Sequence, residues 1–226
     1  ERKNEVYPYD QPTSFFQDVQ TLGGVLPGRA FQFGNQDEHH LYLFHLDRAP
    51  RCEAQDMTIE ILMHGVADPA REQFSLETHA TTEAVREATG VHQIIPGFEV
   101  DDHLFRPTGY SLNAIRDDEY YTVHVTPEEA CSYASFETNH RFNGKRGDVI
   151  QRVLRMFRPR SFDLVIFEQS PDGDVRVGGY RLRSHVEQDL DCGYHVRYLS
   201  FYRPQARAVQ AVELPVRRSP VPESRV

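Results

Sequence analysis

The chain has 226 residues, of which 39% are hydrophobic and 26% charged, which is enough apolar material for one large domain or two small ones. It carries 25 basic against 34 acidic residues, and the net charge of −9 makes nucleic acid and anionic membrane poor partners. No apolar run approaches the roughly 18 residues that a transmembrane helix needs, so none is predicted.

Short segments in which apolar and polar residues alternate dominate the chain, and this period of two is typical of strands. In chain order, we expect a helix over residues 13–22, strands over 39–46 and 56–63, a helix over 82–89, strands over 104–115, 120–126 and 131–138, a helix over 148–157, and strands over 162–169, 175–183 and 194–201. Short connections favour antiparallel pairing, and residues 171–174 are typical of a hairpin turn. The pattern predicts an α+β protein whose helices cover one face of a sheet.

Two helices have clear end signals. Thr81 precedes the helix over 82–89 as an N-cap, and Gly90 follows it as a stop. The helix over 148–157 places Val149, Val153 and Phe157 on one apolar stripe before Pro159.

The strand over 56–63 has an acidic face. Asp56, Thr58 and Glu60 alternate with apolar residues, which usually marks the solvent side of a half-buried sheet. The alternative is a face turned toward a second sheet. Two buried carboxylates would then need a cationic partner, such as a diamine or a nearby Arg or Lys.

Cysteines and histidines give little sign of a metal site. Cys52, Cys131 and Cys192 are far apart, so free thiols in the cytosol are the simplest interpretation. His39, His40 and His45 form the tightest histidine group, but no HExxH and no cysteine partner accompanies them. We therefore expect no metal there.

Ser111 and His124 fall on consecutive predicted strands. His124 shares the face of its strand with Tyr120 and Thr122, and histidine is the commonest acid–base residue near neutral pH. Ser111 lies in Gly-Tyr-Ser-Leu-Asn, which is not the G-x-S-x-G elbow of serine hydrolases. A hydrolase triad is therefore weakly supported.

Three ordered motifs carry a family resemblance: Phe-x-Pro-x-Gly-Tyr-Ser-x-Asn at 105–113, Tyr-x-x-x-His-x-Thr-Pro-Glu at 120–128 and Ser-Tyr-x-Ser-Phe-Glu-Thr-Asn at 132–139. They closely resemble eukaryotic-type S-adenosylmethionine decarboxylase, the pyruvoyl enzyme that makes the aminopropyl donor for spermidine and spermine. Weaker similarity covers most of the chain and fades after about residue 202.

The resemblance implies a four-layer α/β/β/α sandwich of two antiparallel sheets, built from two similar halves. Residues 1–50 would end the first half, residues 51–204 would form the second, and the Pro- and Arg-rich residues 205–226 would be a disordered tail. The chain starts at Glu1 without a signal segment, so we expect a processed, trimmed or partial chain.

The family's cofactor is a pyruvoyl group, which forms by self-cleavage at a Glu-Ser bond and binds the substrate amine as a Schiff base. By similarity, Ser111 steadies the ester intermediate of that cleavage, and His124 is the base for its elimination. Phe105 matches an aromatic residue that stacks on adenine, and Glu128 matches the residue that holds the ribose hydroxyls.

Some family members are stimulated by putrescine. The matching positions are Asp56, Thr58, Glu60, Glu137, Phe167 and Tyr194. Three carboxylates suit a dication, and we therefore expect putrescine activation. Relatives often dimerise through sheet edges, so a homodimer is a further expectation.

The cleavage pair, the proton-donating cysteine and one adenine-stacking aromatic lie upstream in the family. This chain by itself should therefore be inactive and should need the missing N-terminal part as partner. The alternative function is that of a catalytically dead paralogue that regulates an active decarboxylase. Such paralogues usually lose part of the Ser, His and Glu set, which remains here as Ser111, His124 and Glu128.

Overall fold

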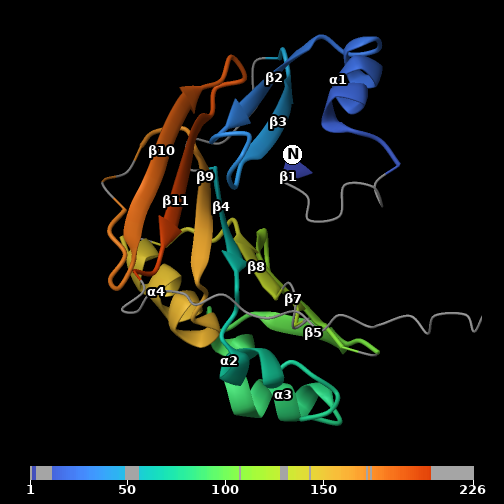
Figure 1. Cartoon of the computed structure of the whole chain (residues 1–226), viewed down its shortest axis with the longest axis vertical. Helices are drawn as coiled ribbons and strands as arrows, with labels where there is room; N and C mark the ends of the chain where they lie inside the picture. Colours follow the sequence, from blue (N-terminus) through green and yellow to red (C-terminus); the bar gives the residue numbers. More distant parts are fainter. Residues whose placement is uncertain are drawn as a thin grey trace, which may run out of the picture.

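The computed structural model describes residues 2–3, 12–48, 56–106, 108–127, 132–142, 144–171, 173 and 175–204. They form a small and a large antiparallel sheet, shown in Figure 1 with helices on the outer sides of both.

The small sheet has the strand order β1-β3-β2, with β1 at Arg2–Lys3, β2 at Gly28–Phe33 and β3 at Leu41–Leu46. Helix α1 (Phe15–Gly23) begins with a capping box between Ser14 and Gln17. The helix covers the outer face of this sheet, where the Phe15 ring stacks on Tyr42 with 4.7 Å between ring centroids.

The large sheet has the strand order β10-β11-β9-β4-β8-β7-β6-β5. Its strands are β4 (Met57–His64), β5 (Glu99–Leu104), β6 (Tyr110–Arg116), β7 (Glu119–Thr126), β8 (Tyr133–Thr138), β9 (Ser161–Glu168), β10 (Arg181–Asp189) and β11 (His195–Tyr202).

One face of the large sheet is covered by α2 (Asp68–Glu72), α3 (Thr82–Thr89), the short 3-10 helix η2 (Val91–Gln93) and α4 (Arg146–Phe157). The main core lies here, with Val153 and Phe157 of α4 packed in one cluster with Ile59 and Ile61 of β4. The predicted N-cap Thr81 accepts a hydrogen bond from the Ala84 N–H, and Gly90 adopts the left-handed conformation after α3. Both helix-end predictions are confirmed.

A second core lies between the two sheets. Phe33, Leu41 and Leu43 of the small sheet pack with Leu62, Val165, Val196 and Tyr198 of the large sheet. Side chains alternate along a strand, so even-numbered residues of β4 face the small sheet and odd-numbered ones face the helices. The layers run α1, small sheet, large sheet, α2–α4, which confirms the predicted α/β/β/α arrangement.

Three strand predictions needed correction. The strand expected over 104–115 begins only at Tyr110, because the chain turns at Gly109, whose φ of +130° suits glycine, and Leu104 instead ends the separate strand β5. The strand expected over 175–183 begins only after Gly179 and runs to Asp189. The hairpin at 171–174 was also wrong, since β9 pairs with β4 and β11 rather than with β10.

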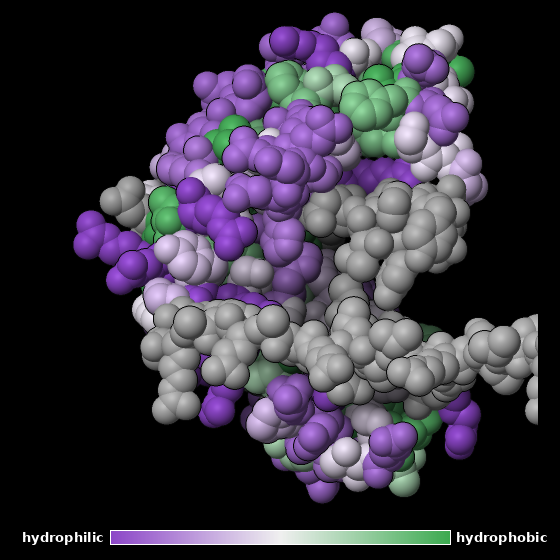
Figure 2. Space-filling model, viewed as in Figure 1, coloured by the Kyte–Doolittle hydropathy of each residue, from purple (hydrophilic) through white to green (hydrophobic). Residues whose placement is uncertain are grey.

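The outer side of the small sheet carries apolar surface. Figure 2 shows hydrophobic surface at the top of the view, over α1 and β2. Phe16 and Leu22 of α1, and Val25 after it, are exposed. Among the described residues, no helix is long and apolar enough to cross a membrane.

Candidate functional site

The β6–β7 hairpin places Ser111 opposite His124. Its two-residue turn at Asp117 and Asp118 pairs Arg116 with Glu119. Because the register continues along both strands, Ser111 and His124 lie directly opposite each other. Asp117 has a φ of +54°, a conformation that aspartate tolerates better than most residues. The local turn thus sets the geometry of the pair.

Ser111 and His124 are in direct contact. The distance from Ser111 Oγ to His124 Nδ1 is 2.9 Å, and the tautomer of the ring decides which of the two donates. The imidazole is exposed and the serine half-buried. A hydroxyl and an imidazole in this contact, on an open face of the sheet, are chemically able to exchange a proton with a neighbouring group.

Phe105 stands beside this pair, at the end of β5. Its N–H donates to the Gly109 carbonyl at 2.8 Å, and its ring packs edge-to-face against His103, which lies opposite Ser111. The ring is 44% exposed, so one side is available for stacking. Glu128, the expected ribose ligand, lies outside the described residues.

The expected diamine-binding acids also meet on this face. Glu60 of β4 lies directly opposite Glu137 of β8, and Glu60 is only 5% exposed. The acidic face of β4 is therefore buried at Glu60, while Asp56 and Thr58 are half-buried. Thr58 lies opposite Phe167, and the Tyr194 hydroxyl donates to the Asp56 carboxylate. The six predicted residues therefore form three neighbouring pairs on β4, β8 and β9 and on the segments before β4 and β11.

Tyr120 belongs to this group but was absent from the predicted set. Its hydroxyl donates to Glu137 Oε1 at 2.5 Å. Burial and the hydrogen bond to Glu137 raise the pKa of Tyr120 above its ordinary value, so the hydroxyl stays a donor. The sequence did offer a signal for Tyr120, since it alternates with Thr122 and His124 and so lies on the same face of β7.

The Ser111–His124 pair and the acidic group are adjacent. His124 lies opposite Ser135, and Thr122 lies opposite Glu137, so the two groups occupy neighbouring rows of the same face. A cavity of about 400 Å³ opens beside them on β5–β7. Its walls include Glu99, Asp101, Asn113, Ile115, Tyr120 and Thr122.

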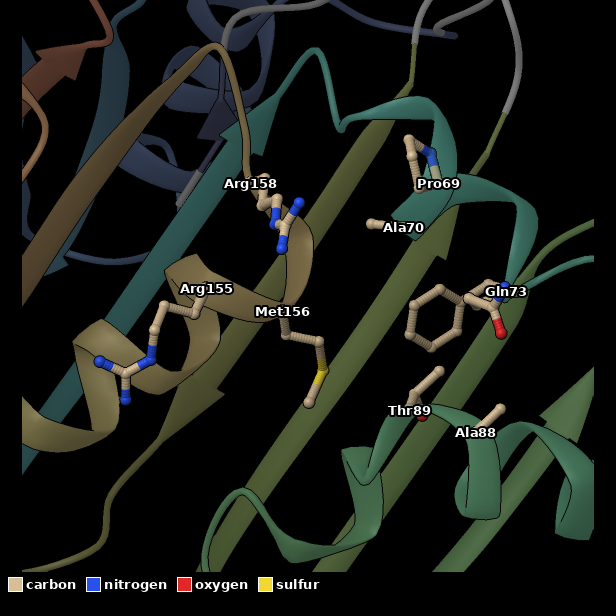
Figure 3. A pocket seen from close by; sticks show the side chains of 9 residues that line it. Pro69, Ala70, Gln73, Ala88, Thr89, Arg155, Met156 and Arg158 are labelled. Carbon is tan, nitrogen blue, oxygen red and sulfur yellow. The ribbon is translucent and has the colours of Figure 1, made fainter.

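A second cavity, of about 240 Å³, lies on the helix side of the sheet. Figure 3 shows Pro69, Ala70 and Gln73 on one wall and Thr89 and Met156 on others, from α2, α3 and α4. It contains none of the predicted site residues and opens away from the face that carries them.

Comparison with known proteins agrees with this geometry. A family model described as adenosylmethionine decarboxylase matches residues 1–202. The S-adenosylmethionine decarboxylase proenzyme of Leishmania donovani is 38% identical, over 90% of this chain and 60% of that protein. The proenzyme of Xenopus laevis is 34% identical, over 74% of this chain and 51% of that protein. The chain thus spans about half to three-fifths of these relatives.

A solved structure supports the same assignment. The crystal structure of the Trypanosoma brucei AdoMetDC-delta26 monomer matches with a TM-score of 0.69 and 26% identity. The match covers 90% of this chain and 83% of that one. On the family match over most of its length, the chain belongs to the adenosylmethionine decarboxylase family.

Proposed function

We propose that the complete protein containing this chain decarboxylates S-adenosylmethionine with a pyruvoyl group and so supplies the aminopropyl donor for spermidine and spermine. The observation that carries the proposal is the Ser111–His124 contact on an open polar face. The relatives named above are decarboxylase proenzymes, so they lend no support to a purely regulatory role.

The residues present fit a pyruvoyl group made by self-cleavage. A hydroxyl and an imidazole, hydrogen-bonded to each other and open to an adjoining chain end, are the donor set that such processing requires. When bound, the pyruvoyl group supplies the carbonyl that withdraws electrons as carbon dioxide leaves. In this proposal His124 takes up a proton during processing, and Ser111 holds the ring and the reacting oxygen in place.

Substrate binding is assigned to the same face. Phe105 offers an exposed ring for the adenine, and aromatic faces also attract a sulfonium cation. Glu128 is proposed as the acceptor for the ribose hydroxyls, because a carboxylate can accept from both members of a diol.

Putrescine is proposed as an activator at the acidic group. Glu60 and Glu137 lie opposite each other on β4 and β8, and Asp56 directly precedes β4. Three carboxylates near partly buried aromatic rings suit a dication with an apolar spacer, whose charges would offset the cost of burying the acids. Phe167 and Tyr194 provide the rings.

A location in the cytoplasm, a homodimer and a division near residue 50 also remain proposals. The thiol of Cys192 is free, which suits a reducing compartment. Strands β5 and β10 are the two edges of the large sheet and are the places where a second copy could add strands.

Self-processing of the complete proenzyme tests the main proposal. His124→Ala should leave the proenzyme uncleaved or stalled, because no base remains beside Ser111. Denaturing gels and intact mass would detect the two product chains and their new end. His185→Ala, which removes an exposed histidine on β10, should process normally. Normal cleavage in the His124 variant would refute the role.

Activity with and without putrescine tests the activator. We expect Glu137→Gln to raise the half-saturating putrescine concentration tenfold or more. The change removes one negative charge that would pair with the diamine and alters the group that accepts from Tyr120. Glu187→Gln, on exposed β10, is the matched control. Equal activity of the unmodified enzyme in both conditions would contradict the proposal.

A further inference from the structure

His39, His64 and Asp163 converge between the two sheets, away from the acidic group. His39 lies just before β3, His64 ends β4, and Asp163 is in β9. The side chain of Asp163 is only 2% exposed, while those of the two histidines are 26% and 22% exposed. Three separate segments thus bring two imidazoles and one carboxylate together.

The ring nitrogens approach the same carboxylate oxygen at ion-pair distance, longer than an ordinary hydrogen bond. His39 Nδ1 lies 3.4 Å and His64 Nε2 lies 3.6 Å from Asp163 Oδ2. Neither of these nitrogens has a hydrogen-bond partner, and neither has Asp163 Oδ1. Two imidazoles this close to a buried carboxylate need a positive charge between them, either a proton on one ring or a bound cation.

These distances match the spacing of ligands around zinc. With zinc–ligand bonds of about 2.0–2.1 Å, the edges of a tetrahedron are about 3.3–3.4 Å long. The three ligand atoms all lie within 4.8 Å of one another. Small shifts of the side chains would therefore place the three atoms at three corners of a zinc coordination tetrahedron.

The surrounding structure holds the group in place. The Tyr198 hydroxyl donates to the His39 carbonyl at 2.7 Å, which ties the segment before β3 to β11. Gly34 allows this close approach, because a Cβ there would lie 2.8 Å from the His39 carbonyl oxygen. In the described part of the chain, no Arg or Lys forms an ion pair with Asp163.

We propose that His39 Nδ1, His64 Nε2 and a carboxylate oxygen of Asp163 bind one Zn²⁺ ion, with water as the fourth ligand. Two imidazoles and a carboxylate are borderline-hard ligands that suit zinc. The ion would join the small sheet to the large one. The proposal departs from the expectation from sequence that no metal binds near His39, an expectation formed without His64 and Asp163, which are distant in the chain.

Zinc titration of the complete protein tests the proposal. After removal of metal with a chelator, isothermal titration with zinc chloride should give one site per chain and a rise in melting temperature. Cobalt(II) should give the intense visible absorption of a tetrahedral site. His64→Gln should weaken zinc binding at least 100-fold and abolish that absorption.

Two further variants make the outcome decisive. His185→Gln removes a histidine that is bonded to a surface carboxylate, Glu187, and should leave the titration unchanged. His39→Gln, in a partly exposed loop, serves if the His64 variant does not fold, as judged by circular dichroism. Absence of zinc binding, or the same affinity in the His39 variant as in the unaltered protein, would overturn the proposal.

Discussion

Glu119 shows how one residue can make the site hairpin sensitive to pH. Burial disfavours its charge, but hydrogen bonds from the Arg141 N–H, Arg116 and His140 outweigh this and lower the pKa of Glu119 from 4.5 to about 2. A lowered carboxyl pKa stabilises the fold above the ordinary pKa, and that stability is lost as pH falls from about 4.5 toward 2.

We therefore predict that Glu119→Gln lowers the free energy of unfolding at pH 7 by up to about 3 kcal/mol, with a smaller loss near pH 3. Urea unfolding followed by circular dichroism at both pH values measures this. Glu87→Gln, on the exposed side of α3, should change little at either pH. An equal loss at pH 3 and pH 7 for the Glu119 variant would contradict the prediction.

At the scale of elements, α3 depends on the cap that its sequence predicts. Thr81 Oγ1 accepts from the Ala84 N–H at 3.3 Å, and Val85 anchors the helix in the core. Thr81→Ala should cost about 1 kcal/mol in the free energy of unfolding, because an N–H at the helix start loses its acceptor. Thr81→Ser, which keeps the hydroxyl, should restore most of it in the same urea titration.

At the scale of the whole molecule, two cores lie on opposite faces of β4. Leu62 faces the small sheet, and its neighbour Ile61 faces the helices. Either residue changed to Ala should cost about 2–5 kcal/mol. Leu62→Ala should speed hydrogen exchange in β2 and β3, whereas Ile61→Ala should speed it in α4. Identical exchange patterns in the two variants would show that the layers unfold as one unit.

Much of the fold follows from local pattern. Alternation marked most strands of the large sheet, Thr81 and Gly90 marked the ends of α3, and the motifs at 105–139 carried the family resemblance. The sequence placed Ser111 and His124 on consecutive strands, but their register came from the structure, where a two-residue turn sets which residues of these strands face each other. Strand alternation, helix caps and short motifs depend only on residues that are close together in the sequence.

The other features depend on segments that are distant in the chain. Alternation alone left open whether Asp56, Thr58 and Glu60 face water, and the packing of Leu62 and its neighbours against the small sheet decided it. The mostly polar edge strand β10 was misplaced because only one neighbour, β11, defines it. His39, His64 and Asp163 meet only once both sheets are packed. Sequence thus determined most of the elements and the family, because both are encoded in local patterns and motifs. Burial and long-range contacts, which no local pattern encodes, decided where the charged residues lie.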